Sequence, residues 1–304
     1  MMSLATGPAD LDLDRVEREL YAQGITAMPG AHPVDLVDRL HADCLRLYEQ
    51  ASTYEGGRVR RGPQRWYYAV HPEQLSVVVE LLSHPWLVQT CTRVLGPDYR
   101  IREVAFDISF PGSRHQPWHR DFRSPVGMVT GDDGTPRLTA LAFNLPTVDV
   151  REELGPLEVV HGTQWDEIPT DDGMFPSQEE GQPRYEADPR RALKSPSRGD
   201  MSARTPLMLH RGTPNVSSSG PRPVMVVTVY AADAQEVLGG HTVLAVTQDF
   251  LDGLPPVVRD HLDCAVVDRL EPIVNTHDIE GLNMGGDDDE VEGPAVAGRV
   301  DPAV

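Results

Sequence analysis

The chain has few positive charges, few cysteines and no long apolar runs, and each of these shortages argues against particular classes of protein. Lysine and arginine number 27 against 47 acidic residues, a formal net charge of −20, which argues against nucleic acid or an anionic membrane as a partner. No stretch has the roughly 18 consecutive apolar residues of a membrane-spanning helix, and no N-terminal stretch resembles a signal peptide. We therefore expect a cytoplasmic protein.

Cysteine is scarce and its positions are uninformative for metal binding. Cys44, Cys91 and Cys264 have no metal-type spacing and are odd in number, so neither a disulfide framework nor a cysteine metal site is expected. We expect the three cysteines to be small, buried side chains of a protein in a reducing compartment.

Hydrophobic residues make up 39% of the 304 residues, enough for a substantial core. Length alone does not separate one large domain from two small ones. The motifs described below spread from His119 to Arg222, which favours a single catalytic domain over residues 1–284. Beyond that point Gly, Asp, Glu, Pro and Ala dominate, and residues 285–304 are predicted to be a disordered acidic tail.

Apolar periodicity changes along the chain. The first third predicts four helices that pack as a scaffold on one face of a sheet, at residues 11–23, 33–50, 73–83 and 85–95. From Tyr99 onward the pattern predicts short strands separated by Gly/Pro turns, at residues 99–110, 138–144, 155–160, 201–210 and 223–230. Many short strands at such spacing are typical of a sandwich or barrel.

Residues 165–198 interrupt the strands with little periodicity. A long loop in a compact domain is more often functional than idle. We predict a lid-like insertion over the mouth of the site, with a solvated insertion as the alternative.

A His-x-Asp pair, His119 and Asp121, follows the first long strand. Residues two apart on a strand point to one face, so the two side chains would converge. Two ligands are too few for a catalytic metal, and the best third candidate is His210, at the end of another apolar run. Two histidines and one carboxylate with open positions form the facial triad of non-haem Fe(II) oxygenases.

Arg222 follows His210 at a distance that a short hairpin spans, and its guanidinium could bind a carboxylate bidentately. A lone His-x-Asp pair occurs by chance in many chains, but the ordered set is far more specific. A zinc hydrolase with the same ligands remains an alternative, although zinc leaves Arg222 unexplained and no H-E-x-x-H-type base is present. A binding module that lost turnover is a third interpretation, which the intact ligands disfavour.

The sequence resembles the phytanoyl-CoA dioxygenase family of Fe(II)/2-oxoglutarate oxygenases over roughly residues 11–231. The matching segments are residues 111–121, 154–163, 199–200 and 210–215, with Arg222. Two positions depart from the family pattern. His161 stands where the family signature usually has proline, and Gly212 stands where the family often has Ser or Thr, which leaves one cosubstrate contact unassigned.

The resemblance implies a mainly β fold with flanking helices around a double-stranded β-helix (jelly-roll, cupin-like) core. It also implies Fe(II) held by His119, Asp121 and His210, with 2-oxoglutarate and O2 as cosubstrates and Arg222 on the distal carboxylate of 2-oxoglutarate. Gln116 would donate its amide to the same cosubstrate. Thr213 and Asn144 are further candidates for hydrogen bonds to it.

The carboxylate of Asp121 favours hydroxylation, because related halogenating enzymes lack that acid. We predict a dioxygenase that hydroxylates an unactivated C–H bond of a small molecule, in secondary metabolism, with release of succinate and CO2. Residue identity does not separate hydroxylation from desaturation, cyclisation or epimerisation. The substrate and the choice between monomer and homodimer also stay open.

Overall fold

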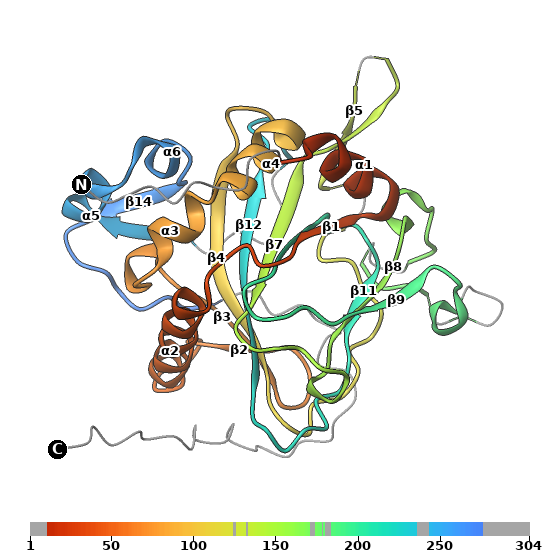
Figure 1. The fold of residues 1–304 in the computed structure, drawn as a ribbon, viewed down its shortest axis with the longest axis horizontal. Helices are drawn as coiled ribbons and strands as arrows, with labels where there is room; N and C mark the ends of the chain where they lie inside the picture. Colours follow the sequence, from red (N-terminus) through yellow and green to blue (C-terminus); the bar gives the residue numbers. More distant parts are fainter. Residues whose placement is uncertain are drawn as a thin grey trace.

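Seven antiparallel strands form the major sheet at the centre of the computed structural model (Figure 1). The structure describes residues 11–123, 126–131, 133–170, 174–177, 179, 184–235 and 243–275. In sheet order the strands are β1 (Ile25–Met28), β10 (Met201–Arg204), β7 (Ala140–Pro146), β12 (Arg222–Tyr230), β4 (Arg100–Ser109), β3 (Arg65–Ala69) and β2 (Val59–Arg60).

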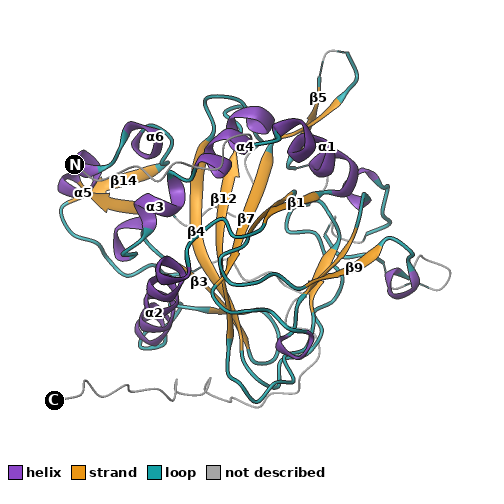
Figure 2. Cartoon of the chain, in the orientation of Figure 1, coloured by secondary structure: helices purple, strands orange, loops and turns teal. Residues whose placement is uncertain are grey.

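A smaller antiparallel sheet contains β11 (His210–Gly212), β8 (Leu157–Val160) and β9 (Arg191–Lys194), in that order. Two further strand pairs are peripheral: the hairpin β5 (Met128–Thr130)–β6 (Pro136–Leu138) and the parallel pair β13 (Leu244–Thr247)–β14 (Cys264–Val267). Strands dominate and helices flank them, as Figure 2 shows, so the predicted mainly β architecture is confirmed.

Four helices cover the outer face of the major sheet: α1 (Leu13–Gln23), α2 (Val34–Ala51), α3 (Val78–Leu82) and α4 (Pro85–Leu95). Outward side chains such as Phe106, Phe143 and Val227 join Leu40 and Trp86 in the largest apolar cluster. The helices therefore provide the predicted scaffold. The helix predicted over residues 73–83 is shorter, because residues 72–74 form a 3-10 turn and α3 begins only at Val78. Two short helices, α5 (Gln248–Gly253) and α6 (Pro256–Arg259), accompany β13 and β14.

The inner face of the major sheet is polar. Successive strand residues point to opposite faces, and on β4 Val104, Phe106 and Ile108 belong to the outer core. Glu103 and Asp107, which alternate with these residues along the strand, therefore point inward. The same alternation turns a set of polar side chains on the other strands inward, namely Arg65, Tyr67, Asn144, Arg204, Arg222 and Thr228.

The single strand predicted over residues 201–210 is wrong. The chain leaves the major sheet after Arg204 and joins the minor sheet at His210, so the run forms two strands in two sheets. Thr205 N–H still bonds to the carbonyl of Gly24, the residue before β1 (2.9 Å), but Pro206 has no N–H to continue the ladder. Leu207, Met208 and Leu209 are fully buried. A buried segment that passes from one sheet to another cannot be distinguished from a strand by hydrophobicity alone.

The strands β2 and β9 lie outside the segments for which the sequence predicted strands. The short strand β2 pairs with β3, and the insertion at residues 165–198 contains β9, which pairs with β8. The predicted tail, residues 285–304, lies outside the described residues. Cys44 and Cys91 are free and buried as expected, and Cys264 is free and half-buried. Of the helices in the described ranges, none has the length and apolar character needed to cross a bilayer.

A buried histidine pair between α2 and α4 makes the fold sensitive to acid. The His32 ring lies edge-on to that of His84, with centroids 4.7 Å apart. Burial, followed by the proximity of His84, lowers the pKa of His32 to about 4. The unfolded chain binds this proton near pH 6.5 and the folded chain does not, so the free energy of unfolding falls as the pH drops from 6.5 to about 4.

We therefore expect His32→Phe, which retains a ring against His84, to be less sensitive to acid than the wild type. The difference amounts to about 1.4 kcal/mol per pH unit in that window, measured by urea unfolding at several pH values. Equal pH slopes for the two proteins would contradict this assignment.

Candidate metal centre

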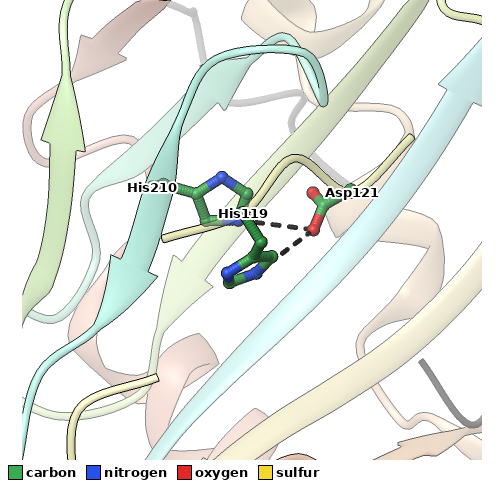
Figure 3. A group of neighbouring side chains, drawn as sticks. All are labelled: His119, Asp121 and His210. Carbon is green, nitrogen blue, oxygen red and sulfur yellow. Dashed lines mark ion pairs between the residues drawn. The ribbon is translucent and has the colours of Figure 1, made fainter. Parts of the chain in front are cut away.

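His119, Asp121 and His210 come together in the structure (Figure 3). Their candidate ligand atoms all lie within 4.8 Å of one another. Asp121 Oδ1 is 3.3 Å from His210 Nε2 and 3.9 Å from His119 Nε2. A residue 91 positions further along the chain thus completes the cluster that the His-x-Asp pair begins.

The backbone places these side chains without a continuous strand. His119 and His210 form an isolated antiparallel bridge, with both N–H···O distances 3.0 Å. Asp121 lies in a bend, where its N–H donates to the Pro206 carbonyl at 2.9 Å. The prediction that His-x-Asp lies on a strand is therefore wrong, because the bridge extends over only one residue. The same break at Pro206 that splits the predicted strand supplies the carbonyl that holds Asp121.

Both imidazoles are held in the tautomer that a metal requires. His119 Nδ1 lies 2.9 Å from the Pro117 carbonyl, and His210 Nδ1 lies 2.9 Å from the Met208 carbonyl. A carbonyl only accepts hydrogen bonds, so each Nδ1 carries the proton and each Nε2 has a free lone pair. The two Nε2 atoms that carry these lone pairs are the ring atoms next to Asp121.

The charge states also suit a cation. Burial, followed by the neighbouring His210, lowers the pKa of His119 to about 3, so this ring is neutral at pH 7. Burial alone would raise the pKa of Asp121, but Arg204 and then His210 lower it well below its usual range. The cluster therefore presents neutral nitrogen and an ionised carboxylate, the donors of a facial triad.

Arg204, on β10, is a site residue that sequence reasoning missed. Its Nη1 lies 2.6 Å from Asp121 Oδ2, and the guanidinium is 8% exposed. This contact holds one carboxylate oxygen and leaves Oδ1 facing the imidazoles. The available signal was a single charged side chain in a largely apolar run at residues 201–210.

Arg222 begins β12 on the inner face and is 5% exposed. Its Nε donates to Ser109 Oγ at 3.1 Å, and its Nη2 contacts Asp107 Oδ1 at 3.2 Å. Burial, followed by the nearby Arg65 cation, lowers the pKa of Arg222 to about 10. The guanidinium therefore stays charged at neutral pH.

Arg65, on β3, is a second buried cation, 3% exposed, beside Arg222. Its Nη1 lies 3.4 Å from Asp107 Oδ1 and 3.4 Å from Gln116 Oε1, and its Nη2 donates to the Thr213 carbonyl at 3.1 Å. Arg65 and Arg222 share the single carboxylate of Asp107. One positive charge is left over, as an anion-binding site requires.

Arg65 also explains the departure at Gly212. A Cβ at residue 212 would lie 2.0 Å from Arg65 Nη1. The guanidinium thus occupies the space that a Ser or Thr side chain would need. A side chain at residue 212 would require this end of the flexible Arg65 side chain to move.

The remaining predicted cosubstrate contacts are largely engaged by the protein itself. Gln116 donates from Nε2 to the Arg61 carbonyl (2.9 Å) and accepts from Gly212 N–H (2.9 Å). Thr213 Oγ1 donates to the Pro156 carbonyl at 2.7 Å. Asn144 lies half-buried on the inner face, its Nδ2 3.3 Å from the Ala142 carbonyl. Their roles toward a cosubstrate stay predictions.

Part of the insertion at residues 165–198 touches the centre. The Phe175 ring lies 6.1 Å from the His119 ring, centroid to centroid. The Met174 carbonyl accepts a hydrogen bond from the backbone N–H of Arg120 at 2.9 Å. Arg120 stands between the candidate ligands His119 and Asp121 in the sequence. This segment therefore lies directly against the His119 side of the site.

This fold and donor set define a mononuclear non-haem metal enzyme with a neighbouring anion site. The sequence model of the phytanoyl-CoA dioxygenase (PhyH) family matches residues 20–224, more than half of the 304 residues. The chain belongs to the phytanoyl-CoA dioxygenase family. Membership confirms the Fe(II)/2-oxoglutarate-dependent oxidoreductase class that the sequence predicted. No curated protein matches the chain significantly.

Several solved structures share the fold, which confirms the double-stranded β-helix core. The epimerase SnoN, in complex with Fe3+, alpha ketoglutarate and nogalamycin RO, superposes with a TM-score of 0.57 at 20% identity, over 86% of this chain and 97% of SnoN. The alpha ketoglutarate dependent carbocyclase SnoK gives 0.58 at 20% identity, over 86% and 95%. HygX from Streptomyces hygroscopicus, with nickel and 2-oxoglutarate bound, gives 0.56 at 14% identity, over 76% and 90%.

Proposed function

We propose that this chain is an Fe(II)/2-oxoglutarate-dependent dioxygenase that hydroxylates an unactivated C–H bond of a small molecule, with release of succinate and CO2. The observation that carries the proposal is the convergence of His119, Asp121 and His210 within 4.8 Å. Their facing atoms are the Nε2 atoms of two imidazoles and an oxygen of the Asp121 carboxylate. Arg222 and Arg65 supply the anion site that a zinc hydrolase would leave unexplained.

The two Nε2 atoms and Asp121 Oδ1 would hold Fe(II) on one face and leave the other positions open. The bound metal, with 2-oxoglutarate and O2, supplies the oxidising chemistry. The chain's own contribution is orientation. The Pro117 and Met208 carbonyls fix the rings, and Arg204 fixes the carboxylate.

Arg222 would bind the distal carboxylate of 2-oxoglutarate, with Arg65 as the second cation of the same subsite. Asp107 orients both guanidinium groups and reduces their mutual repulsion. Gln116 supports Arg65 through its Oε1 atom. Thr213 and Asn144 are assigned as weaker, additional cosubstrate contacts.

Residues 1–284 would act as one catalytic domain, with residues 165–198 as a lid. The ring contact between Phe175 and His119 supports this lid, because it covers one side of the centre and excludes water. We place the protein in the cytoplasm, which suits its free cysteines, as a monomer or homodimer.

A secondary metabolite is the proposed substrate class, since SnoN and HygX structures contain nogalamycin RO and hygromycin B. Epimerisation or ring closure is the second candidate outcome. The observation that favours it is that SnoN is an epimerase and SnoK a carbocyclase on the same fold.

Anaerobic titration of the apoprotein with Fe(II) and then 2-oxoglutarate tests the proposal. A weak visible charge-transfer band that needs both components is the expected result, with competition by zinc measured in parallel. A protein that retains zinc tightly and develops no band with Fe(II) and 2-oxoglutarate would instead favour the hydrolase.

Replacing Arg204 is expected to weaken Fe(II) binding, because Asp121 would lose the partner that fixes its orientation. Loss of such an outer contact typically costs about 10- to 100-fold in metal affinity. We expect this loss for Arg204→Met and partial recovery for Arg204→Lys, measured by chelator competition in the absence of 2-oxoglutarate. An Arg204→Met variant that is folded and binds Fe(II) like the wild type would show that the ion pair has no positioning role.

A further inference from the structure

Three carboxylates mark the region around the centre, and two of them are neutralised by arginine. Asp107 contacts Arg65 and Arg222 at 3.4 and 3.2 Å. Asp121 contacts Arg204 at 2.6 Å. The third, Glu103 on β4, is half-buried and forms no ion pair with any residue that the structure describes.

Glu103 is the last residue of regular pairing on the inner face of β4. Thr228 on β12 pairs with Glu103, but the next residue, Val229, pairs with Ile101, so Arg102 is an extra residue in the ladder. Such bulges reorient side chains and are common near active sites. Arg102 contacts Asp263 (2.9 Å) and lies over the Tyr230 ring, 5.4 Å from its centroid, and does not pair with Glu103.

One hydroxyl group orients the Glu103 carboxylate. Thr228 Oγ1 donates to Glu103 Oε2 at 2.8 Å. An ionised carboxylate offers about four acceptor positions, so this bond leaves most of them available. Arg61 lies over the Tyr67 ring, 5.0 Å from its centroid, and does not pair with Glu103.

Glu103 lies in the same cross-strand row of the inner face as Arg204, the partner of the candidate metal ligand Asp121. Burial and then Glu103 raise the pKa of Tyr67 well above its usual value, and Asp121 contributes in the same direction. The same two carboxylates act on Tyr230, whose ring stacks on Phe122 at 5.7 Å. Glu103 and Asp121 therefore share two neighbouring phenols, and aromatic rings line the space beside them.

We infer that Glu103 is a substrate-binding residue that pairs with a protonated amino group, so that the substrate is a cationic amine. The inference rests on the proposed function. A carboxylate that is oriented, partly solvated and without a cation is suited to a charge-assisted hydrogen bond. An anionic substrate at this position would be repelled by both Glu103 and Asp121.

The test uses benzylamine, which combines an ammonium group with a ring, and benzyl alcohol as its uncharged counterpart. Each is titrated anaerobically into the Fe(II)/2-oxoglutarate protein, and paramagnetic broadening of its proton NMR lines reports binding near the metal. We expect saturable broadening of benzylamine, at least roughly tenfold weaker binding in Glu103→Gln, and little broadening of benzyl alcohol in either protein. The surface variant Glu80→Gln, with a side chain 49% exposed, is the matched control and should bind benzylamine like the wild type.

Benzylamine that broadens no more than benzyl alcohol, or equally in wild type and Glu103→Gln, would overturn the inference. The charge-transfer band of each sample is recorded first. If the charge-transfer band forms normally in Glu103→Gln, the metal and cosubstrate sites are intact, and any loss of benzylamine binding is due to the amine site. Absence of the band from the wild type would instead refute the proposed function itself.

Discussion

His210→Ala is expected to abolish Fe(II) binding at micromolar metal, together with the visible band that 2-oxoglutarate produces. The reason is that the variant removes one of only three protein donors, whereas even an outer contact costs about 10- to 100-fold in affinity. We expect the loss to exceed this range. His119→Ala and Asp121→Ala should behave alike, because all three atoms lie in one cluster.

The measurement is chelator competition with Fe(II), supported by the band intensity and by a thermal melt of each apoprotein. His115→Ala is the matched control, since His115 is exposed and lies outside the cluster. Wild-type affinity in a folded His210→Ala protein would exclude this residue as a ligand.

The second large effect is expected for Arg222→Met, which should raise the dissociation constant for 2-oxoglutarate roughly 10- to 100-fold. The guanidinium is buried and charged, so its charge-assisted hydrogen bonds to a carboxylate are poorly replaced by water. Asp107 keeps Arg65 as a partner in the variant, which limits the damage to the fold. Fe(II) affinity without 2-oxoglutarate should remain unchanged.

Titration of 2-oxoglutarate against the visible band gives this constant directly. Arg211→Met is the control, because Arg211 pairs with Glu158 and Glu186 away from the inner face. An equal loss of Fe(II) and 2-oxoglutarate binding in Arg222→Met would indicate general damage to the site and contradict a specific cosubstrate role.

The metal cluster was predictable from sequence because its parts are local signals. His119 and Asp121 are two residues apart, and His210 ends an apolar run. Their convergence does not depend on the strand that the sequence predicted, since a single backbone bridge between His119 and His210 aligns the segments. The route of the chain between Arg204 and His210 was also mispredicted, because periodicity does not reveal which sheet a buried residue joins.

Arg65 and Arg204 were not predictable in the same way. Arg65 contacts Asp107, Gln116 and Thr213, which are 42, 51 and 148 residues away along the chain. No local pattern encodes such contacts, and a basic residue on a strand is ordinarily a surface residue. Glu103 was hidden for a related reason, since its side-chain hydrogen bond is to Thr228, 125 residues away along the chain.

The contact between Arg65 and Gly212 couples the evolution of two positions far apart in the sequence. No side chain at residue 212 is compatible with the present place of the guanidinium, because a Cβ there would lie 2.0 Å from Arg65 Nη1. A Ser or Thr at this position would displace the guanidinium from its contacts with Asp107, Gln116 and Thr213. We therefore expect the two positions to covary among relatives, and a redesign of either residue should consider both.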